Sequence, residues 1–458
     1  MKNVAPFGYE DIVAIAGKYA ANVPQDISVV GVCTDSRSLV PGNAFIALRG
    51  ETHDGHAHIQ SAIDKGASLV VADTGFAPNP SWNTPVVCVP NTLHCLGSFA
   101  WYHRRRFTLP VVAVAGATGK TSTKDLTAHV LSTTFHVLTT EANYNNQIGT
   151  PLTLLQLTSE HQAAVIEIGT NQPGEIELLS AMVQPTIGLI TNIGKEHLEF
   201  LINLDGVERE ETALFDYLRD HDGLALVNMD DERLAAYAGS FRKAITYAVD
   251  APAEIRPSVS FDSSVRPTIH MVHGAFTFRA PMQSVGLASA YNAVCAVAVA
   301  WALQMHPADV QEGLTSYQPP AAHGYARMVV QHVKGATILN DSYNANPDSM
   351  LMALRTLQKF PAKKRIAVLG DMRELGAAAE EEHMRVLSEA ESVADLVLFI
   401  GNEFRRAFER IDGNHVIAHE THRGLAEDLR EHLEEGTAVL VKGSRGLQME
   451  RVIENLGF

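Results

Sequence analysis

One stretch, residues 111–122 (VVAVAGATGKTS), most constrains what this chain can fold into. Five apolar residues of strand length end at Gly116, and a short loop of small residues follows. The Gly-Lys-Thr motif at 119–121 then opens a segment, 124–131, whose apolar side chains have helical spacing. The pattern predicts a strand, a phosphate-binding loop and a helix.

The residue types in this loop suit a nucleotide phosphate. Glycines let backbone N–H groups close on a phosphate, and the helix N-terminus adds its positive dipole end. Lys120 can neutralise phosphate oxygens and the Thr121 hydroxyl can ligate Mg²⁺. We therefore expect ATP or GTP to bind Gly116, Ala117, Thr118, Gly119, Lys120, Thr121 and Ser122. The loop departs from the G-x-x-x-x-G-K-[ST] pattern at position 114, which is Val.

Composition limits the class of protein. The chain has 458 residues, enough for about three domains, and 46% hydrophobic with 19% charged residues is typical of a globular enzyme. A net charge of −16 disfavours nucleic acid or an anionic membrane as a partner. Four cysteines without a C-x-x-C pair indicate free, buried thiols in a reducing compartment.

Two observations bear on location. The first residues lack an apolar stretch of signal-peptide length, so we expect a cytoplasmic protein. Residues 281–305 carry no charge and are long enough to cross a bilayer, but they contain polar side chains and are rich in alanine. A buried packing helix is the favoured interpretation of that stretch.

The chain divides into three predicted α/β domains. Residues 1–107 alternate short strands with turns and predict a small α/β domain. Residues 108–317 repeat apolar strands with polar ends, which indicates a largely parallel sheet around the phosphate loop. Residues 318–458 predict a second doubly wound, Rossmann-like domain without a phosphate loop, which we expect to close on a ligand held by the middle domain, hinging near residues 317–321.

Two charged residues have alternative interpretations. Glu167 lies in an otherwise apolar strand, where a carboxylate is costly unless it is paired or metal-bound. We favour a Mg²⁺ ligand over a structural ion pair, because the phosphate loop requires a metal. Arg37 could bind a diphosphate or pair with Asp35, and local sequence favours the pair.

Several long motifs along nearly the whole chain resemble the Mur ligase family. They are residues 34–37, 54–56, 116–122, 143–153, 191–197, 341–347, 370–376 and 442–445, together with Glu167. Segments 143–151 and 341–347 are most similar to the member that adds D-alanyl-D-alanine to UDP-N-acetylmuramoyl-tripeptide in peptidoglycan synthesis. The Asp-Asn-Pro-Arg segment of the meso-diaminopimelate-adding member is absent.

The resemblance implies an ATP-dependent peptide ligase that works through an acyl phosphate. Lys120, with Mg²⁺ on Thr121 and Glu167, would neutralise the γ-phosphate, and a second Mg²⁺ would bind near His197. Arg327 and Asp341 would reach the nucleotide, and Asn292 would contact adenine. The first domain would hold the UDP-sugar end. The implied substrate-binding residues are Ser36, Arg37, Asn145, Asn146, Tyr343, Asn344, Asn346, Lys442, Ser444 and Arg445.

The chain departs from the family pattern at two places. Ala288 and Ser289 replace a His-Asn pair before Asn292, so adenine contacts should be fewer. Glu211 aligns with a lysine that relatives modify to a carbamate. We predict that Glu211 supplies the anionic ligand of the second Mg²⁺; the alternative is a solvated charge of the run 208–211.

Two other functions stay open at this point. One is another amide ligase of the family with a different amine, and the other is a Mur-like binding protein without turnover. We expect a monomer, and the third residue of the substrate peptide is not encoded in any motif.

Overall fold

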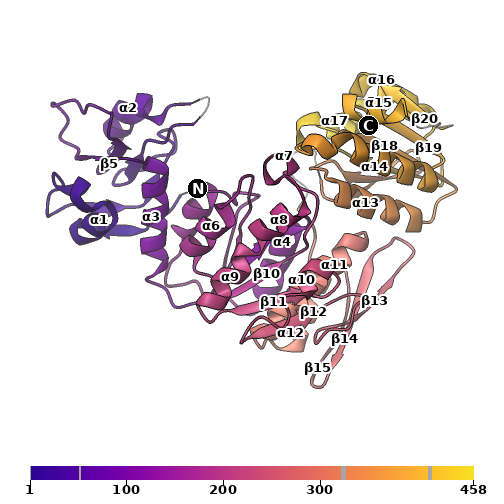
Figure 1. Ribbon diagram of the computed structural model, residues 1–458, viewed down its shortest axis with the longest axis horizontal. Helices are drawn as coiled ribbons and strands as arrows, with labels where there is room; N and C mark the ends of the chain where they lie inside the picture. Colours follow the sequence, from indigo (N-terminus) through magenta and orange to yellow (C-terminus); the bar gives the residue numbers. More distant parts are fainter. Residues whose placement is uncertain (1, 51–52, 321–325, 411–414, 458) are drawn as a thin grey trace. The chain divides into compact units, whose positions relative to one another are not determined.

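The structure is a computed structural model that describes residues 2–50, 53–320, 326–410 and 415–457 (Figure 1). Part of the predicted hinge, Ala321, lies outside these residues. The chain forms two compact units. One comprises Met1–Ala113, Phe135–Thr170 and Gly174–Ile187, and the other comprises Val114–Thr134, Asn171–Pro173 and Gly188–Phe458. The predicted boundaries at 107 and 317 therefore remain predictions.

The N-terminal region is the small α/β fold that its sequence predicts. Its strands are β1 (Pro6–Gly8), β2 (Ser28–Val30), β3 (Val32–Cys33), β4 (Ala44–Ile46), β5 (Leu69–Asp73) and β6 (Val86–Val89), and its helices are α1 (Tyr9–Ala16), α2 (Ile59–Asp64) and α3 (Thr92–Arg104). Strands β3 to β6 form a parallel sheet in that order, and β1 pairs antiparallel with β2.

One glycine breaks the apolar run 29–33 into two strands. Gly31 has φ +88°, and a Cβ there would lie 2.4 Å from the Asn3 carbonyl oxygen. This close approach lets β2 pair with β1 while β3 begins the parallel sheet. The free thiols of Cys33, Cys95 and Cys295 are buried as expected, whereas Cys88 is only partly buried.

The middle region is built on a six-stranded sheet with the order β12-β11-β10-β7-β9-β8. These strands are β7 (Val111–Ala115), β8 (Val137–Thr139), β9 (Ala163–Glu167), β10 (Ile187–Ile190), β11 (Leu224–Asn228) and β12 (Ala244–Tyr247). The helices are α4 (Lys120–Leu131), α5 (Gly149–Leu154), α6 (Glu175–Val183), α7 (Leu198–Leu201), α8 (Leu204–Glu211), α9 (Ala213–Asp220), α10 (Glu232–Ala235), α11 (Leu287–Ala302) and α12 (Pro307–Ser316). Every residue of β7 is buried, as expected for a strand inside the sheet.

The alanine-rich stretch forms the packing helix that we predicted. Helix α11 begins at Leu287, and its buried side chains include Ala293, Val297 and Ala300. It packs against α4, the helix that follows the phosphate loop. None of the described helices is both long and apolar enough to cross a membrane.

A three-stranded antiparallel sheet in the middle region was not predicted. It contains β13 (Ser258–Phe261), β14 (Pro267–His273) and β15 (Phe276–Pro281) in sequence order. The alternation of buried Phe276, Phe278 and Ala280 with exposed neighbours along β15 is the signal that could have revealed it.

The C-terminal region is a doubly wound domain, as its sequence predicts. Its sheet has the order β16-β17-β21-β18-β19-β20, with only the β16–β17 pair antiparallel. The strands are β16 (Val329–Val333), β17 (Ala336–Asp341), β18 (Lys364–Gly370), β19 (Leu396–Ile400), β20 (Val416–His419) and β21 (Thr437–Lys442). The helices are α13 (Pro347–Lys359), α14 (Ala379–Val393), α15 (Asn402–Phe408), α16 (His422–Glu431) and α17 (Glu450–Asn455).

Helices cover both faces of this sheet (Figure 1). One core joins α13, α14 and α15 to the sheet through residues such as Leu354, Leu387 and Phe404. The other joins α16 and α17 through Leu425 and Val452. The sheet is therefore buried on both sides, and its polar strand ends are left to build a site.

Asp371, directly after β18, anchors the start of α15. Its carboxylate accepts hydrogen bonds from the backbone N–H groups of Glu403 (3.0 Å) and Phe404 (2.9 Å). Gly401 permits this approach, since a Cβ there would lie 2.1 Å from the Asp371 Cγ. The side chain thus satisfies two N–H groups that the helix itself leaves unpaired.

We predict that Asp371→Ala lowers the free energy of unfolding by about 1–3 kcal/mol, because one buried and one partly buried N–H donor lose their acceptor. Asp371→Asn keeps one acceptor oxygen and should lose clearly less. Urea unfolding followed by circular dichroism measures both. Equal stability of Asp371→Ala and the unsubstituted protein would contradict this assignment.

Candidate functional site

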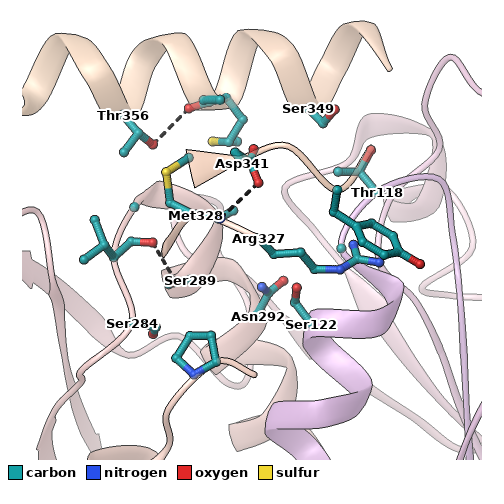
Figure 2. Close-up of a pocket in the computed structure, with 18 of the residues that line it drawn as sticks. Thr118, Ser122, Ser284, Ser289, Asn292, Arg327, Met328, Asp341, Ser349 and Thr356 are labelled. Atoms are coloured by element: carbon teal, nitrogen blue, oxygen red, sulfur yellow. Dashed lines mark hydrogen bonds between the residues drawn. The ribbon is translucent and has the colours of Figure 1, made fainter. Parts of the chain in front are cut away.

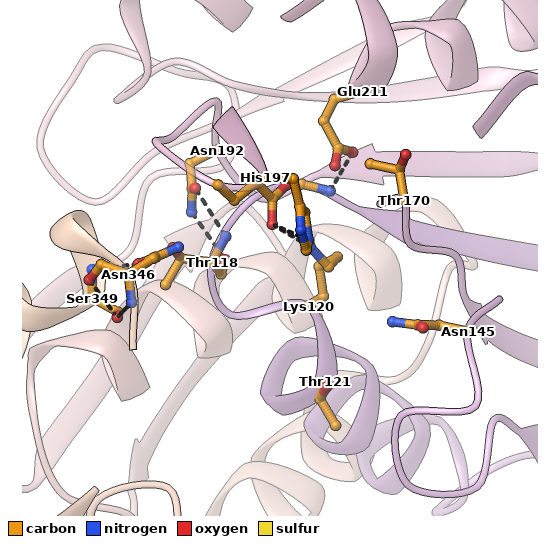
Figure 3. Close-up of polar contacts among 12 residues, drawn as sticks. Thr118, Lys120, Thr121, Asn145, Thr170, Asn192, His197, Glu211, Asn346 and Ser349 are labelled. Carbon is orange, nitrogen blue, oxygen red and sulfur yellow. Dashed lines mark hydrogen bonds and ion pairs between the residues drawn. The ribbon is translucent and has the colours of Figure 1, made fainter. Parts of the chain in front are cut away.

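The phosphate loop joins β7 to α4 as the sequence predicts, and its glycines explain its shape. Gly116 has φ +113°, and a Cβ there would lie 2.3 Å from the Thr191 Oγ1 at the end of β10. The Asn192 side chain accepts from the Thr118 N–H (3.1 Å) and donates to the Thr118 carbonyl (2.9 Å; Figure 3). The loop is therefore held against the segment that follows the neighbouring strand.

A buried charge cluster lies beside the loop. The Lys120 Nζ is 3.0 Å from the Glu196 Oε2, and both side chains are largely buried. The fully buried Glu211 accepts a 2.6 Å hydrogen bond from the Gly116 N–H through Oε2. Burial raises the pKa of Glu211 well above its usual range; Lys120 opposes that shift, whereas Glu196 adds to it. We call Lys120, Glu196 and Glu211 the charge cluster.

These contacts exclude one alternative for Glu211. A solvated surface charge would be exposed, but this side chain is completely buried. Glu208, in the same acidic run, behaves differently because it pairs with Arg233 and accepts from the Tyr237 hydroxyl (3.1 Å). The ligand role of Glu211 remains a prediction.

His197 connects the charge cluster to the C-terminal region. Its Nδ1 lies 2.6 Å from the Glu374 Oε2, and its Nε2 lies 3.9 Å from the Glu196 Oε2. The hydrogen bond with His197 is the main reason why the pKa of Glu374 is lowered, against the opposing effect of partial burial. The ring therefore stands between two carboxylates.

A pocket opens between the phosphate loop and the C-terminal region (Figure 2). Arg327 crosses it, with its guanidinium carbon 3.9 Å from the centre of the Tyr343 ring and its Nη2 donating to the Thr121 Oγ1 (3.1 Å). Asp341 accepts from the Met328 N–H (3.0 Å) at the end of β17. Asn292, from α11, lines the same pocket.

Strand register brings further polar residues to this edge. Asp341 of β17 lies opposite Lys442 of β21, and the Lys442 Nζ is 2.6 Å from the Asp341 Oδ2. Asn346 caps α13 through the Ser349 N–H (2.9 Å) and also donates to the Thr118 hydroxyl (3.1 Å; Figure 3). The remaining predicted residues at this edge make local hydrogen bonds. Asn344 accepts from Lys442 and from the Arg445 N–H. Ser444 donates to the Ala345 carbonyl and accepts from the Arg373 N–H, and the Arg445 side chain donates to Glu450.

The predicted substrate residues of the other compact unit are described separately. Arg37 pairs with Asp35 at 2.9 Å, as local sequence favoured, and its side chain remains 89% exposed. Ser36 is buried, and its carbonyl accepts from Lys65 (2.7 Å).

Glu167, at the end of β9, is buried and accepts a 2.7 Å hydrogen bond from the Asn145 amide. Asn146 caps the turn before α5 by accepting from Ile148 and Gly149.

Sequence reasoning missed Glu196 and Glu374. Glu196 directly precedes His197 in the loop after β10, and Glu374 lies in the quoted motif 370–376, so both were visible as polar residues after strands. What the sequence did not show is that their loops meet. That contact depends on the packing of the C-terminal region.

The donor set fits a divalent cation in part. Among the described residues, no group of three or more His, Cys, Asp or Glu side chains is arranged as a metal cluster. The Oε1 atoms of Glu196 and Glu211 are nevertheless buried without a hydrogen-bond partner among those residues. Two such oxygens require a proton or a cation, and carboxylates with one imidazole suit Mg²⁺ or Mn²⁺.

Comparisons with known proteins agree with this geometry. Three family descriptions match successive segments: "Mur ligase family, catalytic domain" at residues 28–103, "Mur ligase middle domain" at 114–300 and "Mur ligase, glutamate ligase domain" at 326–445. The chain belongs to the Mur ligase family, and it is an enzyme of the ATP-dependent amide ligase class.

Several of the similar proteins share one name. The UDP-N-acetylmuramoyl-tripeptide--D-alanyl-D-alanine ligase of Synechocystis is 33% identical, covering 95% of this chain and 93% of the relative. The protein of that name from Escherichia coli is 32% identical, covering 94% of each. A solved structure of MurF from Acinetobacter baumannii is 27% identical, covers 99% of each chain and has a TM-score of 0.89.

We predict that Arg327→Ala weakens binding of a non-hydrolysable ATP analogue by about 10- to 100-fold, because a charged hydrogen-bond donor leaves the pocket. Isothermal titration calorimetry measures the dissociation constant. Arg423→Ala, on the exposed surface of α16, is the matched control and should bind like the unsubstituted protein. Equal affinities of the two variants would remove Arg327 from the nucleotide site.

Proposed function

We propose that the chain joins D-alanyl-D-alanine to UDP-N-acetylmuramoyl-tripeptide, with ATP as the energy source. The observation that carries this proposal is a phosphate loop whose lysine faces buried carboxylates and which lines a pocket together with Arg327 and Asp341. The shared name of the full-length relatives supports the substrate pair. We place the reaction in the cytoplasm, where its nucleotide-linked substrates are made, and we expect the chain to act as a monomer.

The chemistry requires activation of a carboxylate. A carboxylate oxygen of the tripeptide attacks the γ-phosphorus of ATP, the bond to the β-phosphate oxygen breaks, and ADP leaves. The ammonium group of D-alanyl-D-alanine first loses a proton, and the resulting amine attacks the carbonyl carbon of the acyl phosphate. The C–N bond forms, the C–O bond to phosphate breaks, the nitrogen gives up a second proton, and inorganic phosphate leaves. Negative charge accumulates on phosphate oxygens in the first step, so electrostatic stabilisation is the main demand on the site.

The residues that stabilise this charge belong to one compact unit, which contains both the phosphate loop and the C-terminal region. Lys120 exchanges Glu196 for the γ-phosphate when the nucleotide binds, which places its charge on the transferred group. Arg327 and Asp341 hold the nucleotide from the C-terminal region, and Asn292 contacts its base. Bound Mg²⁺ would supply further positive charge at the phosphates, and Thr121, His197 and Glu211 would hold it. Glu167 belongs to the other compact unit, and its predicted role as a Mg²⁺ ligand stays a prediction.

The remaining residues would bind the two substrates. Ser36 and Arg37 hold the UDP end, and the exposed Arg37 side chain can reach a diphosphate. Asn145 and Asn146 contact the peptide. Tyr343, Asn344, Asn346, Lys442, Ser444 and Arg445 gather at the carboxyl edge of the C-terminal sheet, where an amine substrate can approach.

Phosphate release tests this function against its alternatives. Purified enzyme with ATP, Mg²⁺ and the UDP-tripeptide should release phosphate when D-alanyl-D-alanine is added. Release only with other amines would identify a different amide ligase. No release with any amine would support a binding protein without turnover, and either result would overturn the proposal.

We predict that Lys120→Ala lowers turnover by about 10²-fold or more while the fold is retained, because charge on the transferred phosphate loses its partner. Lys243→Ala is the control, since this exposed lysine pairs with Asp222 on the surface. Turnover of Lys120→Ala within tenfold of the unsubstituted enzyme would remove the phosphate loop from the mechanism.

We also predict that Glu211→Gln loses at least about tenfold more turnover than Glu208→Gln, because Glu211, unlike Glu208, is buried against the phosphate loop, where its carboxylate would supply an oxygen ligand to Mg²⁺. Activity should not depend on added bicarbonate, since no lysine carbamate forms at this position. Steady-state phosphate release measures both properties. Equal, mild losses in the two variants would show that Glu211 is not a metal ligand.

A further inference from the structure

The segment 192–199 touches the phosphate loop on one side. Asn192 holds Thr118, and Glu196 pairs with Lys120. His197 follows directly and is the N-cap residue of the short helix α7. Any displacement of this segment therefore reaches both the loop and the charge cluster.

Three carboxylates from the C-terminal region hold the other side of the same segment. The Asp348 Oδ2 accepts from the Lys195 N–H (2.9 Å), and the buried Glu382 pairs with the Lys195 ammonium. The Glu374 Oε2 lies 2.6 Å from the His197 Nδ1. We call these three residues the carboxylate clasp. Only Glu374 contacts a side chain with a predicted role in the reaction.

The contact between Glu374 and His197 is held by the backbone on both sides. Both residues adopt left-handed conformations, with φ +65° for Glu374 and +48° for His197, which non-glycine residues adopt only where their surroundings enforce it. The Glu199 N–H donates to the Glu374 carbonyl (3.2 Å). Gly376, with φ +52°, packs on Glu199, where a Cβ would come within 3.3 Å.

We propose that Glu374 is a positioning residue for His197. Glu374 accepts the Nδ1–H of the imidazole, which leaves the lone pair on Nε2 and aims it at the charge cluster. Carboxylates orient metal-binding histidines in this way. Because Glu374 belongs to the C-terminal region, His197 takes this orientation when that region rests on segment 192–199. The inference rests on the proposed function.

Kinetics of matched variants provide the first test. In Glu374→Gln, the amide can donate to Nδ1 and favour the wrong tautomer, so kcat should fall by about 10- to 100-fold while the KM for ATP changes less than about twofold. Glu374→Asp keeps the charge and should retain more activity than Glu374→Gln. Glu380→Gln, which removes a surface pair with Arg410, is the control.

A double-variant cycle separates positioning from a general structural effect. If Glu374 acts through the imidazole, Glu374→Gln should cost nothing further in a His197→Ala background. Additive losses would overturn the proposal. Glu374 is half exposed, so the variants should melt within about 2 °C of the unsubstituted protein.

A spectroscopic readout does not depend on turnover. With Mn²⁺ and ADP, pulsed electron paramagnetic resonance of the unsubstituted enzyme should show coupling to a histidine nitrogen, which weakens in Glu374→Gln and persists in Glu380→Gln. No nitrogen coupling in the unsubstituted enzyme, or equal coupling in both variants, would overturn the proposal. Absence of D-alanyl-D-alanine-dependent phosphate release in the unsubstituted enzyme would instead count against the proposed function.

Discussion

The close approach of the phosphate loop to the end of β10 is the constraint on which the site depends. Gly116 has no side chain, so its backbone can press against Thr191 and its N–H can reach Glu211. Asn192 then fixes Thr118 from both its N–H and its carbonyl. The loop keeps its shape through these contacts, and its remaining N–H groups can receive phosphate.

This arrangement buries negative charge beside a lysine. Two buried carboxylates and one ammonium form an electrostatically unfavourable set, because each charge loses hydration and the carboxylates repel each other. The pKa of Glu211 is raised because its carboxylate is buried and lies near Glu196. Such a set gains most from added positive charge, and the same charge is needed when a phosphoryl group is transferred. The unfavourable cluster is therefore consistent with a catalytic role.

Much of the architecture followed from local sequence patterns. The strand, loop and helix at 111–131 and the C-terminal doubly wound sheet were predictable, because apolar periodicity and polar strand ends are local signals. The sheet of β13 to β15 was missed although β15 alternates buried and exposed side chains, because β13 is almost entirely exposed and shows no such period.

The contacts of the site were harder to foresee. Glu196 and Glu374 lie 178 residues apart (374 − 196), and only tertiary packing brings their loops to His197. The burial of Glu211 could not be predicted either, because Glu211 belongs to an acidic run and such runs are usually exposed to solvent.

Asn346 has a consequence for how this family can vary. One side chain ends a loop, starts α13 and touches Thr118 on the phosphate loop. A substitution there alters helix stability and loop contact at the same time, so neither property can drift alone. Selection on either property would retain Asn346, whether or not it contacts a substrate. Thr118 contacts Asn346 but does not cap the helix. A substitution of Thr118 would therefore change the loop contact while the helix cap stays intact.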